Sequence, residues 1–159
     1  MKKRKSWREK LRDTKDLPKI VDVPEKMLGR WGAKRGDILL IPSPLEVDEL
    51  MRKVPEGKLV TIDQLRSALA SRHGASICCP MTTGIFASIA AKAAEEALEE
   101  GERDITPYWR TLKAGGVINE KYPGGPEAQR RLLEKEGHTV VQKGKKYVVP
   151  DYERHLVQI

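Results

Sequence analysis

The sequence predicts a mostly helical α/β domain of the winged helix-turn-helix type, preceded by a basic N-terminal extension. Two capping-box motifs mark the starts of helices, and two of the predicted helices are separated by a short polar loop. A segment of alternating polarity with a basic turn follows the last helix, as a wing would. We therefore expect a domain over residues 41–150, an extension over residues 1–40 and a tail over residues 151–159.

The charge balance of the chain is basic. Its 159 residues contain 30 Lys and Arg against 23 Asp and Glu, which gives a formal net charge of +7. Such an excess favours a polyanionic partner, nucleic acid first, although a merely solvated basic surface is the alternative. No apolar run approaches the roughly 20 residues of a membrane helix, and no secretory signal follows the basic N-terminus. We expect no membrane association.

The extension begins with a basic run over residues 2–5, after which Trp7 and Leu11 are spaced as on one helix face. Two hypotheses are open for this arm. It contacts phosphates while Trp7 docks or stacks, or it is a frayed and solvated terminus.

Weakly extended segments are predicted at residues 19–23 and 38–41, with chain breaks at Pro24 and at residues 36–37. Residues 29–32, Gly-Arg-Trp-Gly, lie between these segments. Their pattern is consistent with a surface turn or with a small nucleic-acid contact, and the sequence does not decide between the two.

Capping boxes predict where the first two helices of the domain begin. One at residues 43–46, with Pro at the first helical position, starts a helix that ends before Pro55. The other at residues 61–64 starts a helix that runs to about Ser71. Each motif satisfies backbone N–H groups that the first helical turn leaves without partners.

A longer helix is predicted over residues 83–100, after a polar loop at residues 72–80. Its expected inward face is apolar and consists of Ile85, Phe86, Ile89, Ala90, Ala93 and Ala97. With the preceding helix it forms a helix-turn-helix in which it is the recognition helix. Four carboxylates in its C-terminal half would repel phosphate, so only its N-terminal turns are expected to enter a groove: Glu95, Glu96, Glu99 and Glu100.

The last predicted helix covers residues 126–136 and ends at Gly137. Residues 138–149 then alternate in polarity around the turn at residues 142–146, which predicts a β-hairpin. Two hypotheses are open for the lysines at its tip, which are Lys143, Lys145 and Lys146. They contact phosphates of a bound nucleic acid, or they only keep the hairpin soluble.

Residues 106–137 resemble the active-site block of the O6-alkylguanine-DNA alkyltransferases. That family has a Pro-Cys-His-Arg segment, a Gly-containing loop, a Tyr, a Gly-Gly pair and a helix ending in Leu-Leu-x-x-Glu-Gly. This chain has, in the same order and with matching spacing, Pro107, Arg110, Tyr122, Gly124, Gly125, Leu132, Leu133, Glu136 and Gly137. The looser similarity extends over residues 41–138. It implies the family's C-terminal DNA-binding domain, with double-stranded DNA as partner.

The residues that would carry the family's reaction are absent. The nucleophilic Cys position is Tyr108, and the adjacent His position is Trp109. A tyrosine hydroxyl stays protonated up to about pH 10, so it does not replace a thiolate. The chain therefore resembles the Cys-less alkyltransferase-like branch, which implies a non-catalytic DNA-binding protein that senses alkylated or modified bases in DNA repair.

The resemblance also implies the residues of a base pocket, which are Pro107, Tyr108, Trp109, Arg110 and Tyr122. Their rings would stack on a flipped base, and each such stack is worth ~1–3 kcal/mol. The alternative is that Tyr108 and Trp109 fill the former pocket as core. Without a His to orient, Glu136 is expected to have a structural role, bonded to Arg110 or to a backbone amide.

The recognition helix departs from the family as well. Gly84 occupies the position of the finger Arg, and no Arg lies between His73 and Glu102. The expected DNA contacts are therefore small and polar: Thr61, Thr82, Thr83, Gly84 and Ser88.

The adjacent cysteines, Cys78 and Cys79, leave a second function open. As a relocated nucleophile, either would make the chain a repair alkyltransferase, whereas the simpler hypothesis is two small apolar residues in a turn. Neighbouring cysteines rarely bridge one another, and no metal-ligand spacing is present, so we expect a cytoplasmic protein without metal or cofactor. A third hypothesis is an interaction module that keeps only the fold and binds a protein partner.

Overall fold

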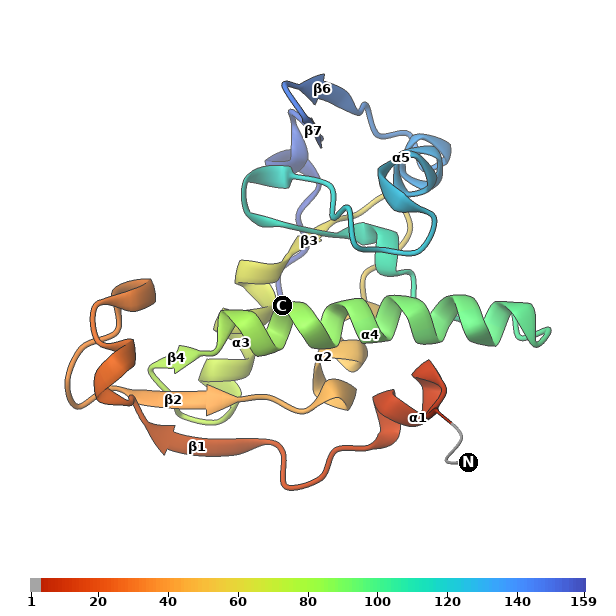
Figure 1. Cartoon of the computed structure of the whole chain (residues 1–159). Helices are drawn as coiled ribbons and strands as arrows, with labels where there is room; N and C mark the ends of the chain where they lie inside the picture. Colours follow the sequence, from red (N-terminus) through yellow and green to blue (C-terminus); the bar gives the residue numbers. More distant parts are fainter. Residues whose placement is uncertain (1–3) are drawn as a thin grey trace.

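The computed structural model describes residues 4–159 and shows a long central helix, α4, with other elements on either side of it (Figure 1). The helices are α1 (Trp7–Arg12), α2 (Pro44–Arg52), α3 (Ile62–Arg72), α4 (Pro80–Glu99) and α5 (Gly125–Lys135). The strands are β1 (Lys19–Asp22), β2 (Ile38–Ile41), β3 (Val60–Thr61), β4 (Ile77–Cys78), β5 (Thr111–Leu112), β6 (Val141–Lys143) and β7 (Lys146–Val148). The fold class is the predicted one, mostly helical α/β.

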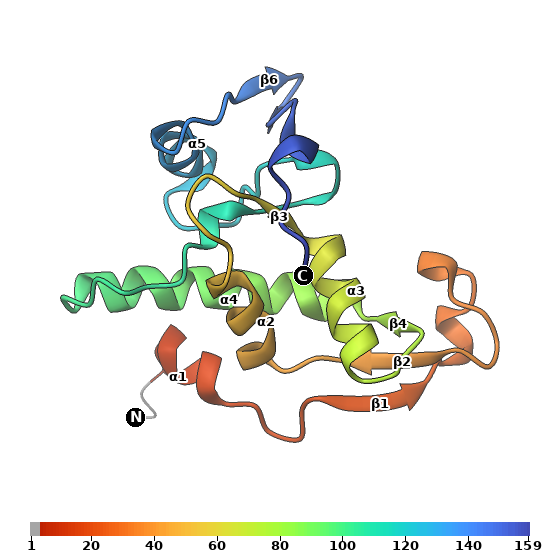
Figure 2. The ribbon, with the colours of Figure 1, turned by 180° about the vertical axis from the view of Figure 1, so that it is seen from behind.

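The buried residues form two hydrophobic clusters, and the elements lie on two sides of α4. On one side lie α1, α2, α3 and the sheet β1–β2–β4, and on the other lie α5, the hairpin β6–β7 and the pair β3–β5 (Figures 1 and 2). The larger cluster joins α2, α3 and α4, and the smaller includes Leu59, Leu112 and Leu133. Trp109 packs against both clusters, so it lies at their junction.

Both predicted capping boxes are present. The Ser43 hydroxyl accepts from the Glu46 amide at 3.3 Å, and the Glu46 carboxylate accepts from the Ser43 amide at 3.2 Å. Thr61 and Gln64 make the same reciprocal pair, at 3.3 and 3.0 Å, and start α3. The predicted starts of α2 and α3 are confirmed.

The long helix differs from the prediction in its start and in its faces. It begins at Pro80, three residues early, because Pro is accommodated in a first helical turn. Ile85, expected inward, is 58% exposed, so that assignment was wrong. The buried stripe follows Thr83, Ala87, Ala90 and Ala94, and Ile85 lies about 200° around the helix from its neighbours in that stripe at about 100° per residue.

The two terminal segments are part of the folded body. The expected boundary at residue 40 falls inside β2, which pairs antiparallel with β1 and parallel with β4. At the other end, the Leu59 amide donates to the His155 carbonyl at 2.8 Å, and the Val157 amide donates to the Leu59 carbonyl at 2.9 Å.

The N-terminal arm is docked on α4 rather than frayed. The backbone amides of Trp7 and Arg8 both donate to the Glu96 carboxylate at 3.1 Å. The ammonium groups of Lys10 and Lys92 lie 4.2 and 4.4 Å from the centre of the Trp7 ring. Lys2 and Lys3 of the basic run lie outside the described residues.

The predicted hairpin is present and is attached to the loop before α5. Strands β6 and β7 pair antiparallel, and Val117 forms a bridge to Val148. None of the helices within residues 4–159 has the length and apolar character needed to cross a membrane.

We predict that Thr61→Ala lowers the free energy of unfolding by about 1 kcal/mol, because it removes the acceptor that caps α3. Urea denaturation measures this change, and Thr61→Ser is the control that keeps the acceptor. An unchanged midpoint for Thr61→Ala would show that the cap does not stabilise the helix.

Candidate nucleic-acid interface

A buried carboxylate orders the region that resembles the alkyltransferase block. The Glu136 side chain is 7% exposed and accepts from Arg110 Nη2 at 2.8 Å and from Arg110 Nε at 3.0 Å. It also accepts from Trp109 Nε1 at 2.7 Å and from the Gly57 amide at 3.0 Å. Burial alone would raise the pKa of Glu136, but these bonds hold the pKa below its ordinary value.

The partners of Glu136 match the sequence analysis in part. Arg110 and a backbone amide were both named there, and both are bonded to the carboxylate. The hydrogen bond from the Trp109 indole to Glu136 was not predicted. The signal that could have indicated it is that Trp109 directly precedes Arg110 and carries an N–H donor. Trp109 thus contributes a hydrogen bond but no titratable nitrogen at the position where the family has a His.

Tyr108 occupies the nucleophile position as a core residue. It is 1% exposed, its ring packs edge-on against Trp109 and Tyr122, and its hydroxyl donates to the Glu95 carboxylate at 2.7 Å. Burial, followed by the bond to Glu95, raises the pKa of Tyr108 far above its ordinary value. The phenol therefore remains protonated and cannot serve as a nucleophile.

The pocket candidates do not line one open cavity. Pro107, Tyr108 and Tyr122 are buried, and Arg110 is bonded to Glu136 and to the Val54 carbonyl. The alternative hypothesis was that the aromatic rings fill this space as core. Tyr108 and Tyr122 agree with it, because both belong to the larger hydrophobic cluster.

A cleft of about 440 Å³ lies next to Tyr108, between α4, the loop before α5 and α5 itself. Pro123, Ala128 and Leu132 supply its apolar lining. Charged side chains of both signs surround it: Glu95, Glu99, Arg131 and Lys135. Its volume is in the range of small-molecule sites, so it has room for a base.

The outer face of the N-terminal half of α4 is apolar. Met81 and Ile85, one turn apart, are 56% and 58% exposed, while Thr82, Gly84 and Ser88 are half-buried. Lys92 is the only charged residue between Pro80 and Ala94. Small polar contacts were expected on this face, whereas the apolar pattern placed Ile85 in the core and gave Met81 no role.

Two of the expected DNA contacts have structural roles instead. Thr83 is fully buried, and its hydroxyl donates to the Cys79 carbonyl at 2.7 Å, because its position belongs to the inward stripe. Thr61 is 6% exposed, and its hydroxyl caps α3. The expectation that Thr61 and Thr83 face a groove was wrong.

Three of the four carboxylates at the acidic end of α4 are bonded to other parts of the fold. Glu95 binds the Tyr108 hydroxyl, and Glu96 binds the two amides of α1. Arg8 is paired with Glu100, and with Glu102 at 2.8 Å. The carboxylates that would repel phosphate are thus largely engaged by partners within the fold.

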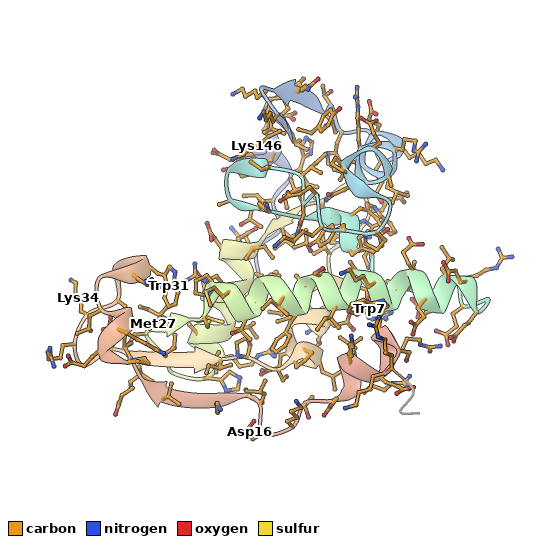
Figure 3. The ribbon with its side chains drawn as sticks, in the orientation of Figure 1. Trp7, Asp16, Met27, Trp31, Lys34 and Lys146 are labelled. Carbon is orange, nitrogen blue, oxygen red and sulfur yellow. The ribbon has the colours of Figure 1, made fainter. Side chains whose placement is uncertain are left out.

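The hairpin presents its basic tip to solvent. Lys143, Lys145 and Lys146 are all exposed, and none has an ion-pair partner within residues 4–159. Figure 3 shows Lys146 on the side of α4 opposite to β1 and β2. These lysines are available to an anionic partner.

The two cysteines are unsuited to a nucleophilic role. Cys78 and Cys79 are both buried, and burial raises the pKa of the Cys78 thiol. The Thr82 hydroxyl donates to Cys79 Sγ at 3.1 Å. Among the described residues, no group of three or more His, Cys, Asp or Glu could hold a metal ion.

No family model and no curated protein matches the chain. Among solved structures it is similar to S. pombe Atl1 in complex with damaged DNA containing O6-carboxymethylguanine, with 17% identity and a TM-score of 0.51. A second structure, of S. pombe ATL in complex with DNA, has 15% identity and a TM-score of 0.46. Each match covers 73% of this chain and 94% of the other. The first confirms the predicted alkyltransferase-like fold.

We predict that Glu136→Gln lowers the free energy of unfolding by about 1.5–3 kcal/mol at neutral pH, because its hydrogen bonds are made to an ionised group. Since the folded-state pKa lies below the ordinary 4.5, this contribution is present above pH 4.5 and is lost as pH falls through the folded-state pKa. Denaturation of both forms over an acidic pH series measures the difference. Glu134→Gln, on the exposed face of α5, is the control, and a difference that does not change with pH would contradict the assignment.

Proposed function

We propose that this chain is a non-catalytic protein that binds duplex DNA and senses alkylated or otherwise modified bases. The observation that carries the proposal is the division of charge along α4. Its N-terminal half is free of carboxylates and has an exposed outer face at Met81 and Ile85, whereas Glu95 and Glu96 of its acidic half are bonded to Tyr108 and to α1. A basic hairpin lies in the same molecule, and phosphate contacts of this kind position a protein on DNA.

The apolar outer face of α4 supports a mode of contact that does not require an arginine finger. Proteins that bind the minor groove insert Met, Leu, Ile or Phe between base steps and partly unstack them. Met81 and Ile85 are side chains of this type on successive turns, and Gly84 between them permits close backbone approach. We infer that these two residues meet the base stack.

Lesion recognition is the part of the proposal that rests on the cleft beside Tyr108. Atl1, whose fold the chain shares, was crystallised with DNA that contains O6-carboxymethylguanine. In this chain the cleft offers an apolar lining together with the Glu95 and Glu99 carboxylates, which accept the N–H groups of a base edge. Binding in the cleft would leave a modified base unchanged, because Tyr108 is buried and protonated.

The first experiment measures binding to a duplex with and without one O6-methylguanine, at a series of salt concentrations. We expect tighter binding of the modified duplex, and log K that falls with log salt at a slope of about −3 or steeper if three hairpin lysines each neutralise one phosphate. Mass spectrometry of the protein after incubation should show no methyl adduct. Equal affinity for the two duplexes would contradict the sensor role. Absence of binding to either duplex at low salt would contradict the whole proposal.

A second prediction concerns the face of α4. Met81→Ala with Ile85→Ala is expected to weaken duplex binding about tenfold through lost apolar contact, with an unchanged salt slope, because no charge is removed. A 2-aminopurine base placed in the duplex reports unstacking by its fluorescence, and we expect the double variant to lose the change in fluorescence that the wild-type protein causes. Leu98→Ala is the matched control, since Leu98 is 46% exposed on the acidic half of the same helix. Equal effects of the two changes would argue against a wedge at Met81 and Ile85.

A further inference from the structure

We propose that residues 24–36, the Trp31 loop, form a second nucleic-acid contact that binds the DNA strand as it passes the N-terminal end of α4. The inference rests on the duplex binding proposed for α4 and adds a contact outside that helix. The ligand class is a DNA strand, bound through its phosphates by basic side chains and through one base or sugar by the indole of Trp31.

The backbone of the loop holds Trp31 in an unusual conformation. Trp31 has φ 56° and ψ 23°, in the left-handed region, and lies between Gly29 and Gly32, which also have positive φ. The Gly29 amide donates to the Ala33 carbonyl at 2.8 Å, and the Ala33 amide donates to the Arg30 carbonyl at 2.8 Å. Residues other than glycine rarely adopt this region, and such positions cluster at ligand-binding sites.

Core packing does not account for the side chain of Trp31. It is half-buried and belongs to neither hydrophobic cluster, and its indole N–H makes no hydrogen bond within residues 4–159. Figure 3 shows Trp31 on the side of the loop nearer to α4, with Lys34 at the outer edge. A large aromatic ring at the surface of a preformed turn is a suitable platform for stacking.

The charges of the loop favour an anionic strand. Lys26, Arg30 and Lys34 have exposed side chains without an ion-pair partner among the described residues. The one carboxylate of the loop, Glu25, is paired with Arg35 at 2.6 Å, and Asp37, directly after the loop, accepts from the Lys34 amide at 2.9 Å. The free charge that faces solvent is therefore positive.

The strands place this loop next to the start of α4. The loop leads into β2, and the Ile38 carbonyl accepts from the Ser76 amide at 2.9 Å. Further along, the Leu40 carbonyl accepts from Cys79, the residue that precedes α4. Three extended residues span about 10 Å, so the loop lies roughly three base steps beyond the helix. Figures 1 and 2 both show the loop beyond this end of α4.

Two variants test the two kinds of contact separately. Trp31→Gly removes the ring but tolerates the left-handed backbone, so the loop keeps its shape. Arg30→Ala with Lys34→Ala removes two unpaired charges. The matched control is Arg52→Ala with Lys53→Ala, which removes two exposed charges at the end of α2, beside Asp104 and the acidic end of α4.

Duplex affinity is measured for all forms over a salt series, with thermal unfolding of each protein. We expect Trp31→Gly to weaken binding by about fivefold or more with an unchanged salt slope and no loss of thermal stability, and Trp31→Phe to restore most of the affinity. The double change at Arg30 and Lys34 should reduce the salt slope by about two, and the control should change it much less.

Three results would overturn the inference. Wild-type affinity for both loop variants would leave the proposed function standing without the loop. A loss matched by the control at Arg52 and Lys53 would show a general charge effect instead of a contact. Failure of the wild-type protein to bind any duplex would remove the proposed function and the inference together. If Trp31→Gly does not fold, Trp31→Asn, which also tolerates left-handed backbone, takes its place.

Discussion

The bonds made by the Glu136 carboxylate hold three separate segments of the chain in register. The carboxylate lies at the end of α5, and its donors come from Trp109, Arg110 and the amide of Gly57, in the loop that leads to β3. Arg110 extends the network to the Val54 carbonyl after α2. Since Tyr108 directly precedes this pair, its position against α4 depends on the same carboxylate. A buried charge with so many donors specifies one arrangement, because any other would leave it unpaired.

A second constraint acts along α4. The last two turns of this 20-residue helix contain Glu95, Glu96 and Glu99, and Glu100 is its C-cap, so this end would repel a polyanion. Three of these carboxylates nevertheless accept bonds from within the fold: Glu95, Glu96 and Glu100. Glu96 receives two amides from α1, and Glu95 receives the phenol of Tyr108. The N-terminal arm and Tyr108 therefore have the same effect. Each supplies hydrogen-bond donors to a carboxylate in the acidic half of α4.

Local signals predicted the starts of α2 and α3 and the hairpin. The capping boxes at Ser43 and Thr61 involve residues three apart, and the hairpin follows from alternation around one turn, so neighbours in the sequence decide both. The docking of α1 could not be predicted in this way, because Trp7 and its acceptor Glu96 are 89 positions apart. The hydrogen bond from Trp109 to Glu136 could not be predicted for the same reason, because these two residues are 27 positions apart. Side-chain pairing across the core depends on tertiary geometry, which the pattern of one segment does not contain.

Within the predicted inward face of α4, Ala90, Ala93 and Ala97 are buried as expected, and Ile85 was mispredicted for a different reason. Apolar residues occur almost all round its first turns, so periodicity alone could not separate the buried stripe from an exposed one. The helix buries alanines and presents Ile85, the reverse of what residue size suggests. Small residues inside allow neighbouring helices to approach closely. The larger apolar side chain is left on the outer face, beside Met81.

The packing of Tyr108 has a consequence for any attempt to place a thiol at this position. Placing a cysteine at position 108 would open a void between Trp109 and Tyr122 and leave Glu95 without its donor. The new thiol would still have no base, since the indole of Trp109 is already committed as a donor to Glu136. Building a thiol reaction here would therefore need coordinated replacements at several positions. A single change of Tyr108 to Cys would cost stability through the void and the unpaired carboxylate, without supplying a reactive thiolate.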